Sequence, residues 1–222
     1  DEDTAFVILE PIQGESGINV APDGFLQEVR KVCDEKGIIL IFDEIQAGLG
    51  RTGRLWACDH WNTAPDILCL AKGIAGGVPM GATLVRPDIL ASMSKGDHSS
   101  TFGGNPLSCA AGIATLQALT QDGLIENSEK MGKIFREGLD KLKEKHTIIR
   151  EIRGKGLMIG VELKFEVKDI LMNLMKEGVL MLYSGRNILR ILPPLVISKE
   201  DITKVLQTLD AVLTIEEQKN TV

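Results

Sequence analysis

Short apolar runs alternate with longer segments of mixed polarity through the first half of the chain. The runs that are rich in Val, Ile and Leu and bounded by turn residues are Ala5–Leu9, Ile38–Phe42, Ile67–Leu70 and Gly81–Val85. Such runs predict strands buried on both faces, and the segments between them, such as Gly24–Lys36, predict crossover helices. This alternation indicates an α/β fold with a mostly parallel sheet.

The second half of the chain begins with a helical period and continues with short strands. Apolar residues recur at helical spacing from Asn105 to Lys145, and Asp122-Gly123 divides this stretch into two predicted helices. Beyond it we expect helices near Lys168–Glu177 and Lys199–Leu213 and strands at Ile148–Ile152, Leu157–Leu163, Val179–Tyr183 and Ile188–Ile191. These elements predict a small α+β domain. We place the boundary near Leu124, so that residues 1–124 and 125–222 form two domains, and expect the tail Glu216–Val222 to be frayed.

Composition and charge narrow the class of protein. Of the 222 residues, 44% are hydrophobic and 25% are charged, which is typical of a globular protein. The net charge is −6 and no basic cluster forms a phosphate-binding stripe, so we do not expect a nucleic-acid partner. No apolar run approaches the roughly 20 residues of a membrane helix, so we expect no membrane partner. The four cysteines, which stand singly in the sequence, are Cys33, Cys58, Cys69 and Cys109. This spacing favours the reduced thiols of a cytoplasmic protein over a metal site.

The first candidate for chemistry is Asp43, which with Glu44 directly follows an apolar run. A carboxylate at the carboxyl end of a buried parallel strand faces the crevice in which open α/β sheets bind ligands. Two other interpretations are that Asp43 only caps the next turn, or that it holds Mg²⁺ in a nucleotide hydrolase. A hydrolase also needs a phosphate loop, but Gly132-Lys133 and Gly154-Lys155 are not followed by Ser or Thr.

The second candidate is Lys72, which ends another apolar run and precedes Gly73. We expect a lysine at such a strand end to be desolvated, which favours the neutral amine that forms a Schiff base; the alternative is a surface lysine. Lys72 follows Asp43 by one strand–connection–strand unit. An amine and a carboxylate so placed suit pyridoxal phosphate (PLP), because the amine can bind its aldehyde and the carboxylate can keep its ring nitrogen protonated.

Two further candidates are suited to anions. Ser100 and Thr101 precede two glycines and a helix that begins near Pro106, and hydroxyls beside a helix N-terminus bind phosphate, although an ordinary capped helix has the same pattern. Arg190 stands alone in an apolar stretch, where its planar fork suits a substrate carboxylate. The alternative is a structural ion pair with Glu15 or Glu162.

Together these segments resemble the class III, or ω-amino-acid, aminotransferases of PLP fold type I, and among them the acetylornithine and ornithine aminotransferase group. The matching motifs are Leu9–Glu15, Phe42–Gly53, Pro65–Gly73, Ser100–Pro106, Arg153–Gly156 and Arg190 with Pro193–Leu195. The resemblance is to the C-terminal part of such enzymes. It implies that residues 1–124 are the end of the large PLP-binding domain, with its mixed, mostly parallel sheet, and residues 125–222 the small domain. The part with the cofactor's phosphate loop and stacking aromatic residue would precede Asp1, so we expect the chain alone to bind PLP weakly.

The resemblance implies cofactor roles for five residues. Lys72 would bind PLP covalently and shuttle the proton, and Asp43 would pair with the pyridine nitrogen. Gln46 would contact the ring 3-oxygen. Thr101, with Ser100, would bind the phosphate of the neighbouring subunit's cofactor, which implies a homodimer.

The resemblance also implies how substrates are held. Arg190 would bind the carboxylate of glutamate or 2-oxoglutarate, and Glu15 would pair with Arg190 when a donor presents its terminal amine. Glu10 and Arg153 would support the site.

The activity implied by the resemblance is transfer of a terminal amino group from N-acetylornithine or a similar diamino acid to 2-oxoglutarate, in arginine or lysine biosynthesis. Alternatives with the same fold are ornithine, 4-aminobutyrate and carrier-protein-lysine aminotransferases and glutamate-semialdehyde aminomutase. A different class of alternative is a truncated, non-catalytic dimerisation module. A cytoplasmic location is expected, with the mitochondrial matrix as the alternative.

Overall fold

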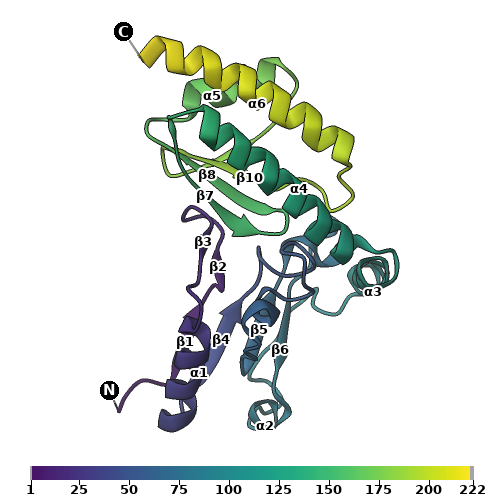
Figure 1. The fold of residues 1–222 in the computed structure, drawn as a ribbon. Helices are drawn as coiled ribbons and strands as arrows, with labels where there is room; N and C mark the ends of the chain where they lie inside the picture. The colour runs from purple at the N-terminus through teal and green to yellow at the C-terminus, as the bar shows by residue number, and fades with distance from the viewer. Residues whose placement is uncertain (1, 221–222) are drawn as a thin grey trace. The chain divides into compact units, whose positions relative to one another are not determined.

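The computed structural model describes residues 2–220, which form two compact units (Figure 1). The first unit contains the residues through Pro11 together with Ala21–Gly50 and Arg54–Gly123. The second contains Ile12–Val20, Arg51–Gly53 and the residues from Leu124 onward. Two short segments of the first half of the chain therefore belong to the second unit. The assignment of residues 1–124 and 125–222 to a large and a small domain stays a prediction.

The first unit is built on a four-stranded mixed sheet with the order β1-β4-β5-β6. Strands β1 (Phe6–Leu9), β4 (Ile39–Asp43) and β5 (Ile67–Leu70) are parallel, and β6 (Ala82–Val85) is antiparallel to β5. The mostly parallel sheet predicted from the apolar runs is therefore confirmed. Its parallel strands place three carboxyl ends at one edge of the sheet.

The connections between these strands differ from the prediction in one place. Helix α1 (Phe25–Lys36) joins β1 to β4, as expected, and ends at Gly37, whose left-handed φ of 65° suits glycine. The connection between β4 and β5 contains only a short 3-10 helix, η1 (Ala57–Trp61), so the crossover helix expected there is wrong.

The strands of the first unit are not all buried on both faces, as their apolar runs predicted. One face of β4 and β5 is fully buried, through Leu40, Phe42, Leu68 and Leu70. On β1, however, Phe6 and Ile8 are 54% and 53% exposed. A continuous apolar run shows that a strand can be buried on both faces, but it does not show what covers each face.

The second unit contains a four-stranded antiparallel sheet with the order β7-β8-β10-β9. Its strands are β7 (Ile149–Lys155), β8 (Met158–Leu163), β9 (Leu182–Ser184) and β10 (Ile188–Ile191). Each strand lies within a few residues of its predicted position, with β9 displaced most, toward its C-terminal side. A short hairpin of β2 (Ile12–Gln13) and β3 (Asn19–Val20), which the sequence analysis did not predict, also belongs to this unit.

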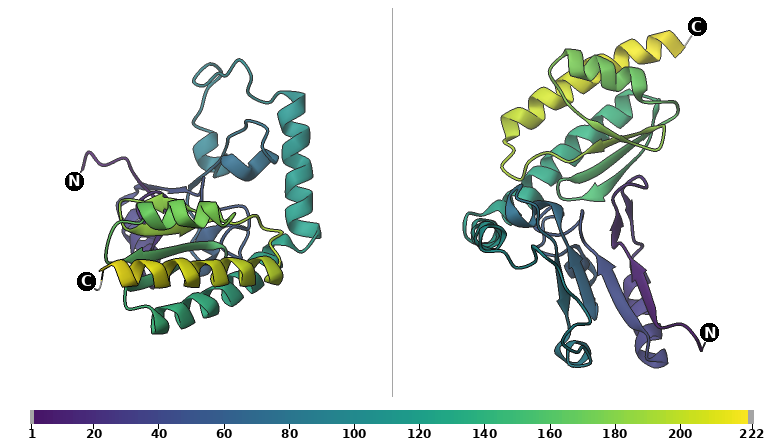
Figure 2. Two further views of the ribbon diagram at one scale, coloured as in Figure 1. Left: turned by 90° about the horizontal axis from the view of Figure 1, so that it is seen from above. Right: turned by 180° about the vertical axis from the view of Figure 1, so that it is seen from behind.

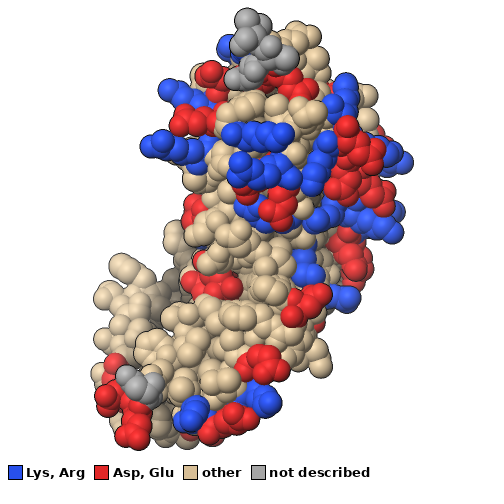
Figure 3. Space-filling view, turned by 60° about the vertical axis from the view of Figure 1, so that its left-hand side comes forward, with Lys and Arg blue, Asp and Glu red and all other residues tan. Residues whose placement is uncertain are grey.

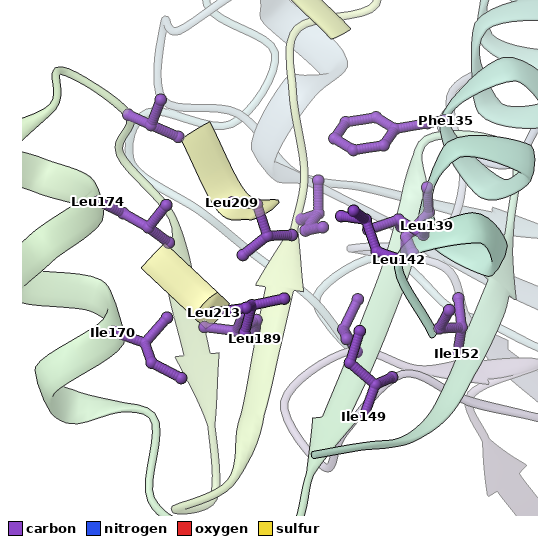
Figure 4. Close-up of a cluster of buried hydrophobic side chains, with 14 of the residues drawn as sticks. Phe135, Leu139, Leu142, Ile149, Ile152, Ile170, Leu174, Leu189, Leu209 and Leu213 are labelled. Carbon is purple, nitrogen blue, oxygen red and sulfur yellow. The ribbon is translucent and has the colours of Figure 1, made fainter. Parts of the chain in front are cut away.

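The core of the second unit lies between this sheet and three helices, α4 (Leu124–Lys145), α5 (Lys168–Lys176) and α6 (Lys199–Asn220) (Figures 2 and 4). Apolar side chains on α4 and α6 are spaced at helical intervals, and they pack against alternate residues of the strands. Buried members of this core include Phe135, Leu139, Leu157, Leu163, Ile170, Leu189, Leu209 and Leu213.

Helix α6 continues through Asn220, so the frayed tail expected over 216–222 is wrong for 216–220, and residues 221–222 lie outside the described part. Three polar contacts lie in the last turns. The carboxylate of Glu217 accepts hydrogen bonds from Thr147 and from the backbone N–H of Ile148, both at 3.2 Å. Glu216 forms an ion pair with Lys219 at 2.9 Å.

Asp210 on α6 links this helix to the end of α4. Its carboxylate accepts hydrogen bonds from Lys145 at 2.7 Å and lies 2.6 Å from Nε2 of the buried His146. The bond from Lys145 and then that from His146 lower the pKa of Asp210. A lowered folded-state pKa stabilises the protein above the unfolded pKa of about 3.9, and this stabilisation is lost as the pH falls through the folded-state value.

We therefore expect Asp210→Asn to lower the free energy of unfolding at pH 7 by about 1 kcal/mol, because one third of the side chain is exposed and water screens the interaction. The difference from the wild type should disappear below the folded-state pKa. Urea denaturation at pH 7 and in acid measures the free energy of unfolding of the variant and the wild type at the two pH values. The control is Asp140→Asn, which changes an exposed carboxylate on α4. An equal loss at both pH values would contradict the electrostatic explanation.

Candidate active site

Asp43 is the last residue of β4 and is half-buried at the carboxyl edge of the parallel strands. In the register of β4 and β5 it lies opposite Cys69. Its Oδ1 accepts a hydrogen bond of 2.9 Å from the backbone N–H of Ile45, which orients the carboxylate. The capping bond considered in the sequence analysis is therefore present, and it uses one of the two carboxylate oxygens.

The neighbouring carboxylate, Glu44, has a different role that the sequence analysis missed. It is fully buried and accepts hydrogen bonds from the backbone N–H groups of Ala57 and Cys58, at 2.6 and 2.7 Å. Burial raises the pKa of Glu44, against the opposite effect of these two hydrogen bonds. Glu44 thus holds the start of η1, and this explains how the connection from β4 to β5 is ordered without a crossover helix.

Lys72 begins the 3-10 helix η2 (Lys72–Ala75), two residues after β5 ends. Because Asp43 lies opposite Cys69, Lys72 and Asp43 leave adjacent parallel strands at the same edge of the sheet. The backbone of Lys72 has a φ of 47°, in the left-handed region that costs a non-glycine residue on the order of 1 kcal/mol. Strained residues of this kind cluster at functional sites.

Lys72 is exposed, so the desolvation expected for this residue is wrong for the structure described. The strand places the lysine as predicted, but no other described segment covers it from water. The sequence pattern could indicate the strand end, whereas solvent exposure depends on what packs above it.

Helix α3 (Pro106–Gln121) holds the segment that carries Lys72. A Cβ on Gly112 of α3 would lie 3.7 Å from the carbonyl oxygen of Ile74, so the helix and η2 pack closely. Ser108, in the first turn of α3, donates a hydrogen bond of 3.2 Å to the carbonyl of Pro79. Asn105 caps the helix by accepting a hydrogen bond of 2.9 Å from the backbone N–H of Ser108.

The three other predicted cofactor residues lie in loops of the first unit. Ser100 and Thr101 are exposed and directly precede the capped start of α3. Gly103 lies so close to Ser100 that a Cβ there would be 2.9 Å from the Ser100 Cβ. Gln46 is half-buried in the turn that follows Asp43.

A separate arrangement in the second unit surrounds Arg190 of β10, which is 8% exposed. Its Nη1 donates to the carboxylate of Glu15 at 2.6 Å and to the carbonyl of Gly14 at 3.1 Å. Of the two partners considered in the sequence analysis, Glu15 is therefore the one observed. Glu162 instead pairs with Arg150 and Arg153, at 2.9 and 2.8 Å, and those bonds lower its pKa, with the Arg153 contribution the larger.

Arg190 has unused hydrogen-bonding capacity. Within residues 2–220 its Nε is buried and has no hydrogen-bond partner. A buried N–H left unsatisfied costs free energy, and a carboxylate is the natural acceptor for a guanidinium. The Glu15 side chain opposite is 70% exposed although it is paired. This is the arrangement expected if a ligand carboxylate can compete with Glu15 for Arg190.

The residues of the first unit fit the requirements of PLP. Lys72 supplies an exposed primary amine, Asp43 an oriented carboxylate at the same sheet edge, and Ser100 and Thr101 supply hydroxyls before a capped helix. A cofactor with an aldehyde, a basic ring nitrogen and a phosphate needs these three kinds of group.

Comparison with known proteins identifies the family. The family model of class-III aminotransferases matches residues 1–213, so the chain belongs to this family. It is 48% identical over 214 residues to an acetylornithine aminotransferase of Caldanaerobacter subterraneus, covering 96% of this chain and 54% of that protein.

Two solved structures have the same fold. An ornithine aminotransferase from Toxoplasma gondii superposes with a TM-score of 0.95 at 38% identity, covering 99% of this chain and 53% of that one. An acetylornithine aminotransferase from Elizabethkingia anophelis gives a TM-score of 0.90 at 38% identity, with 95% and 56% covered. The fold predicted from the resemblance is confirmed. The chain spans about half the length of the curated relatives it matches.

The surface charge and the character of the helices are relevant to nucleic-acid and membrane partners. Basic and acidic side chains are interspersed on the face shown in Figure 3, without an uninterrupted basic stripe there. No helix within residues 2–220 has the length and apolar character needed to cross a bilayer.

Proposed function

We propose that the protein is a PLP-dependent aminotransferase that moves the terminal amino group of N-acetylornithine, or a closely similar diamino acid, to 2-oxoglutarate. The observation that carries this proposal is the placement of Asp43 and the left-handed Lys72 at one edge of adjacent parallel strands. The name of the Caldanaerobacter relative, acetylornithine aminotransferase, supports N-acetylornithine as the donor.

Each cofactor residue of the first unit would have a different role. PLP, when bound, supplies a ring that withdraws electrons from the substrate carbon. Lys72 would provide the nucleophilic Nζ and then carry the proton, and Asp43 would pair with the protonated ring nitrogen. Ser100 and Thr101 would hold the phosphate, and Gln46 would hold the ring 3-oxygen.

The second unit would select the substrate. Arg190 binds the carboxylate of 2-oxoglutarate or glutamate, which satisfies its free donors with a bidentate, charge-assisted contact. When the donor presents a terminal amine, Glu15 remains paired with Arg190, at the observed 2.6 Å, and neutralises it. The Arg190–Glu15 pair could thus accept two ligands that differ by one carboxylate.

Ornithine is the second candidate donor. The Toxoplasma gondii protein with the TM-score of 0.95 is an ornithine aminotransferase. Ornithine and N-acetylornithine present the same terminal amine and differ only at the α-nitrogen, so a panel of donors separates them.

We also propose that the protein is a homodimer and that it is located in the cytoplasm. Helix α3 is apolar on most sides, and helices of this kind are normally buried. Its side chains Leu107 and Ile113 are nevertheless 71% and 59% exposed, and Phe102 before it is 80% exposed. A second copy that covers this helix would bring Thr101 beside the neighbouring cofactor. The four free cysteines suit a reducing compartment.

The test begins with the native protein and added PLP. We expect visible absorbance of the bound cofactor and, after borohydride reduction and peptide mapping, a label confined to Lys72, because this lysine shares the carboxyl edge of adjacent parallel strands with Asp43. Transfer to 2-oxoglutarate should then be fastest from N-acetylornithine in a panel that includes ornithine and 4-aminobutyrate. A label scattered over several lysines, or no transfer from any terminal amine, would contradict the proposal.

A further inference from the structure

The hairpin that carries Glu15 is held to the sheet of the second unit by side chains from three strands. Arg190 of β10 donates to the carbonyl of Gly14 at 3.1 Å, and Arg153 of β7 donates through Nε to the carbonyl of Gly17 at 2.8 Å. Between them, the hydroxyl of Ser184, the last residue of β9, donates to the carbonyl of Glu15 itself. The backbone on both sides of the Glu15 side chain is therefore fixed.

Close packing restricts the same backbone. Ile18 is completely buried, and a Cβ on Gly160 of β8 would lie only 3.1 Å from its Cβ and from the carbonyl oxygen of Gly17. A Cβ on Gly17 would lie 2.7 Å from Cδ1 of Ile188. The hairpin tip thus lies directly on the sheet and cannot shift as a unit without breaking these contacts.

Arg153 is itself held in place. Its Nη1 pairs with Glu151 and Glu162, both at 2.8 Å, and its side chain is 14% exposed. An arginine fixed by two carboxylates loses little further side-chain entropy when its Nε binds a carbonyl.

We propose that Ser184 and Arg153 are positioning residues for substrate selection, which hold the hairpin backbone so that the Glu15 side chain alone moves on and off Arg190. This inference rests on the proposed function. A carboxylate ligand then displaces only one exposed side chain, and the fixed backbone returns Glu15 to Arg190 after the ligand leaves. The strength of the Glu15–Arg190 pairing sets the preference between a terminal-amine donor and a dicarboxylate.

Loss of the Ser184 hydroxyl should loosen the backbone at Glu15 and weaken its pairing with Arg190. Arg190 then becomes more available to a ligand carboxylate. We expect Ser184→Ala to raise the ratio of kcat/KM for glutamate to kcat/KM for N-acetylornithine about threefold to tenfold, the effect of one neutral hydrogen bond. The change should appear mainly in KM, because Ser184 acts through the hairpin on Arg190, which is proposed to bind the substrate carboxylate.

Ser184→Thr is the matched rescue variant, because it keeps the hydroxyl, and it should leave the ratio near the wild-type value. Thr203→Ala is the control for loss of a hydroxyl bonded to a carbonyl elsewhere in the unit, since Thr203 donates to Lys199 on α6 at 2.9 Å. Arg153→Lys keeps the charge beside Glu162 but removes the Nε donor. It should shift the ratio in the same direction as Ser184→Ala.

The experiment uses the native protein with PLP and measures both donors for each variant. An unchanged ratio in Ser184→Ala, or an equal change in Ser184→Thr, would overturn the inference while leaving the proposed function intact. If the wild type transfers no amino group from any donor, the proposed function fails first. Hydrogen exchange at Ser16 and Gly17 then still tests whether Ser184→Ala loosens the hairpin, and unchanged exchange would overturn the positioning role.

Discussion

Replacement of Lys72 by Ala should abolish transamination in the native protein, lowering kcat on the order of 10⁴-fold or more. The amine of Lys72 is proposed both to bind the cofactor and to move the proton, and loss of one proton-transfer group alone costs about 10²-fold to 10⁴-fold. Lys72 is exposed and its left-handed φ strains Ala as much as Lys, so the free energy of unfolding should change by less than about 0.5 kcal/mol. The loss would therefore be chemical rather than structural.

Steady-state rates with N-acetylornithine and 2-oxoglutarate measure the effect of the Lys72 substitution. Lys36→Ala, which removes an exposed lysine from the last turn of α1, is the matched control and should retain normal rates. An added primary amine should partly restore Lys72→Ala if the missing group is the proton carrier. Normal turnover by Lys72→Ala would contradict the proposed function.

Gly156→Ala should destabilise the second unit by about 3 to 5 kcal/mol, a large effect for a single methyl group. Gly156 follows β7, and a Cβ there would lie 2.3 Å from the carbonyl carbon of Thr52 and 2.7 Å from the backbone nitrogen of Gly53. Both contacts are with backbone atoms, which cannot rotate away. The segment Arg51–Gly53 would have to leave the unit, together with the hydrogen bond of 3.0 Å from Leu157 N–H to Arg51.

Gly185→Ala separates steric overlap from backbone conformation. Gly185 has a φ of 58°, close to the 52° of Gly156, and a Cβ there would meet nothing within 4 Å. Its cost should be only the roughly 1 kcal/mol of a left-handed alanine. Calorimetry of both variants measures the difference in melting temperature, and equal shifts would show that the overlap at Gly156 is relieved.

Local pattern was sufficient for most elements of this protein. The strand Ile67–Leu70 and the helices on either side of Asp122-Gly123 could be predicted because their apolar periodicity and turn residues are encoded within a dozen neighbouring positions. The hairpin of β2 and β3 could not, because each strand has only two residues and depends on long-range contacts with Arg153 and Ser184. The helix that ends at Asn220 was underestimated because contacts with residues 146–148 stabilise its last turns.

Some residues of the candidate site could likewise be predicted from local pattern, and others could not. Asp43 and Lys72 could be selected from the sequence because each comes at the end of an apolar run, and parallel strands end at one edge. The structural role of Glu44 was not evident, since a carboxylate beside Asp43 has the same local pattern whether it reaches the edge or is buried. Adjacent residues of a strand point to opposite faces, and only the tertiary fold shows which face is filled.

The sequence by itself determined most strands and helices, the family and the residues with suitable chemistry, because these depend on residue type and short-range spacing. Tertiary structure decided that Arg190 pairs with Glu15 rather than Glu162, that Lys72 is exposed, and that Ser184 holds the hairpin. The pair of Arg190 and Glu15 joins residues that are 175 positions apart in the chain. No local pattern contains such contacts, since they arise only when separate elements pack and their polar groups find partners.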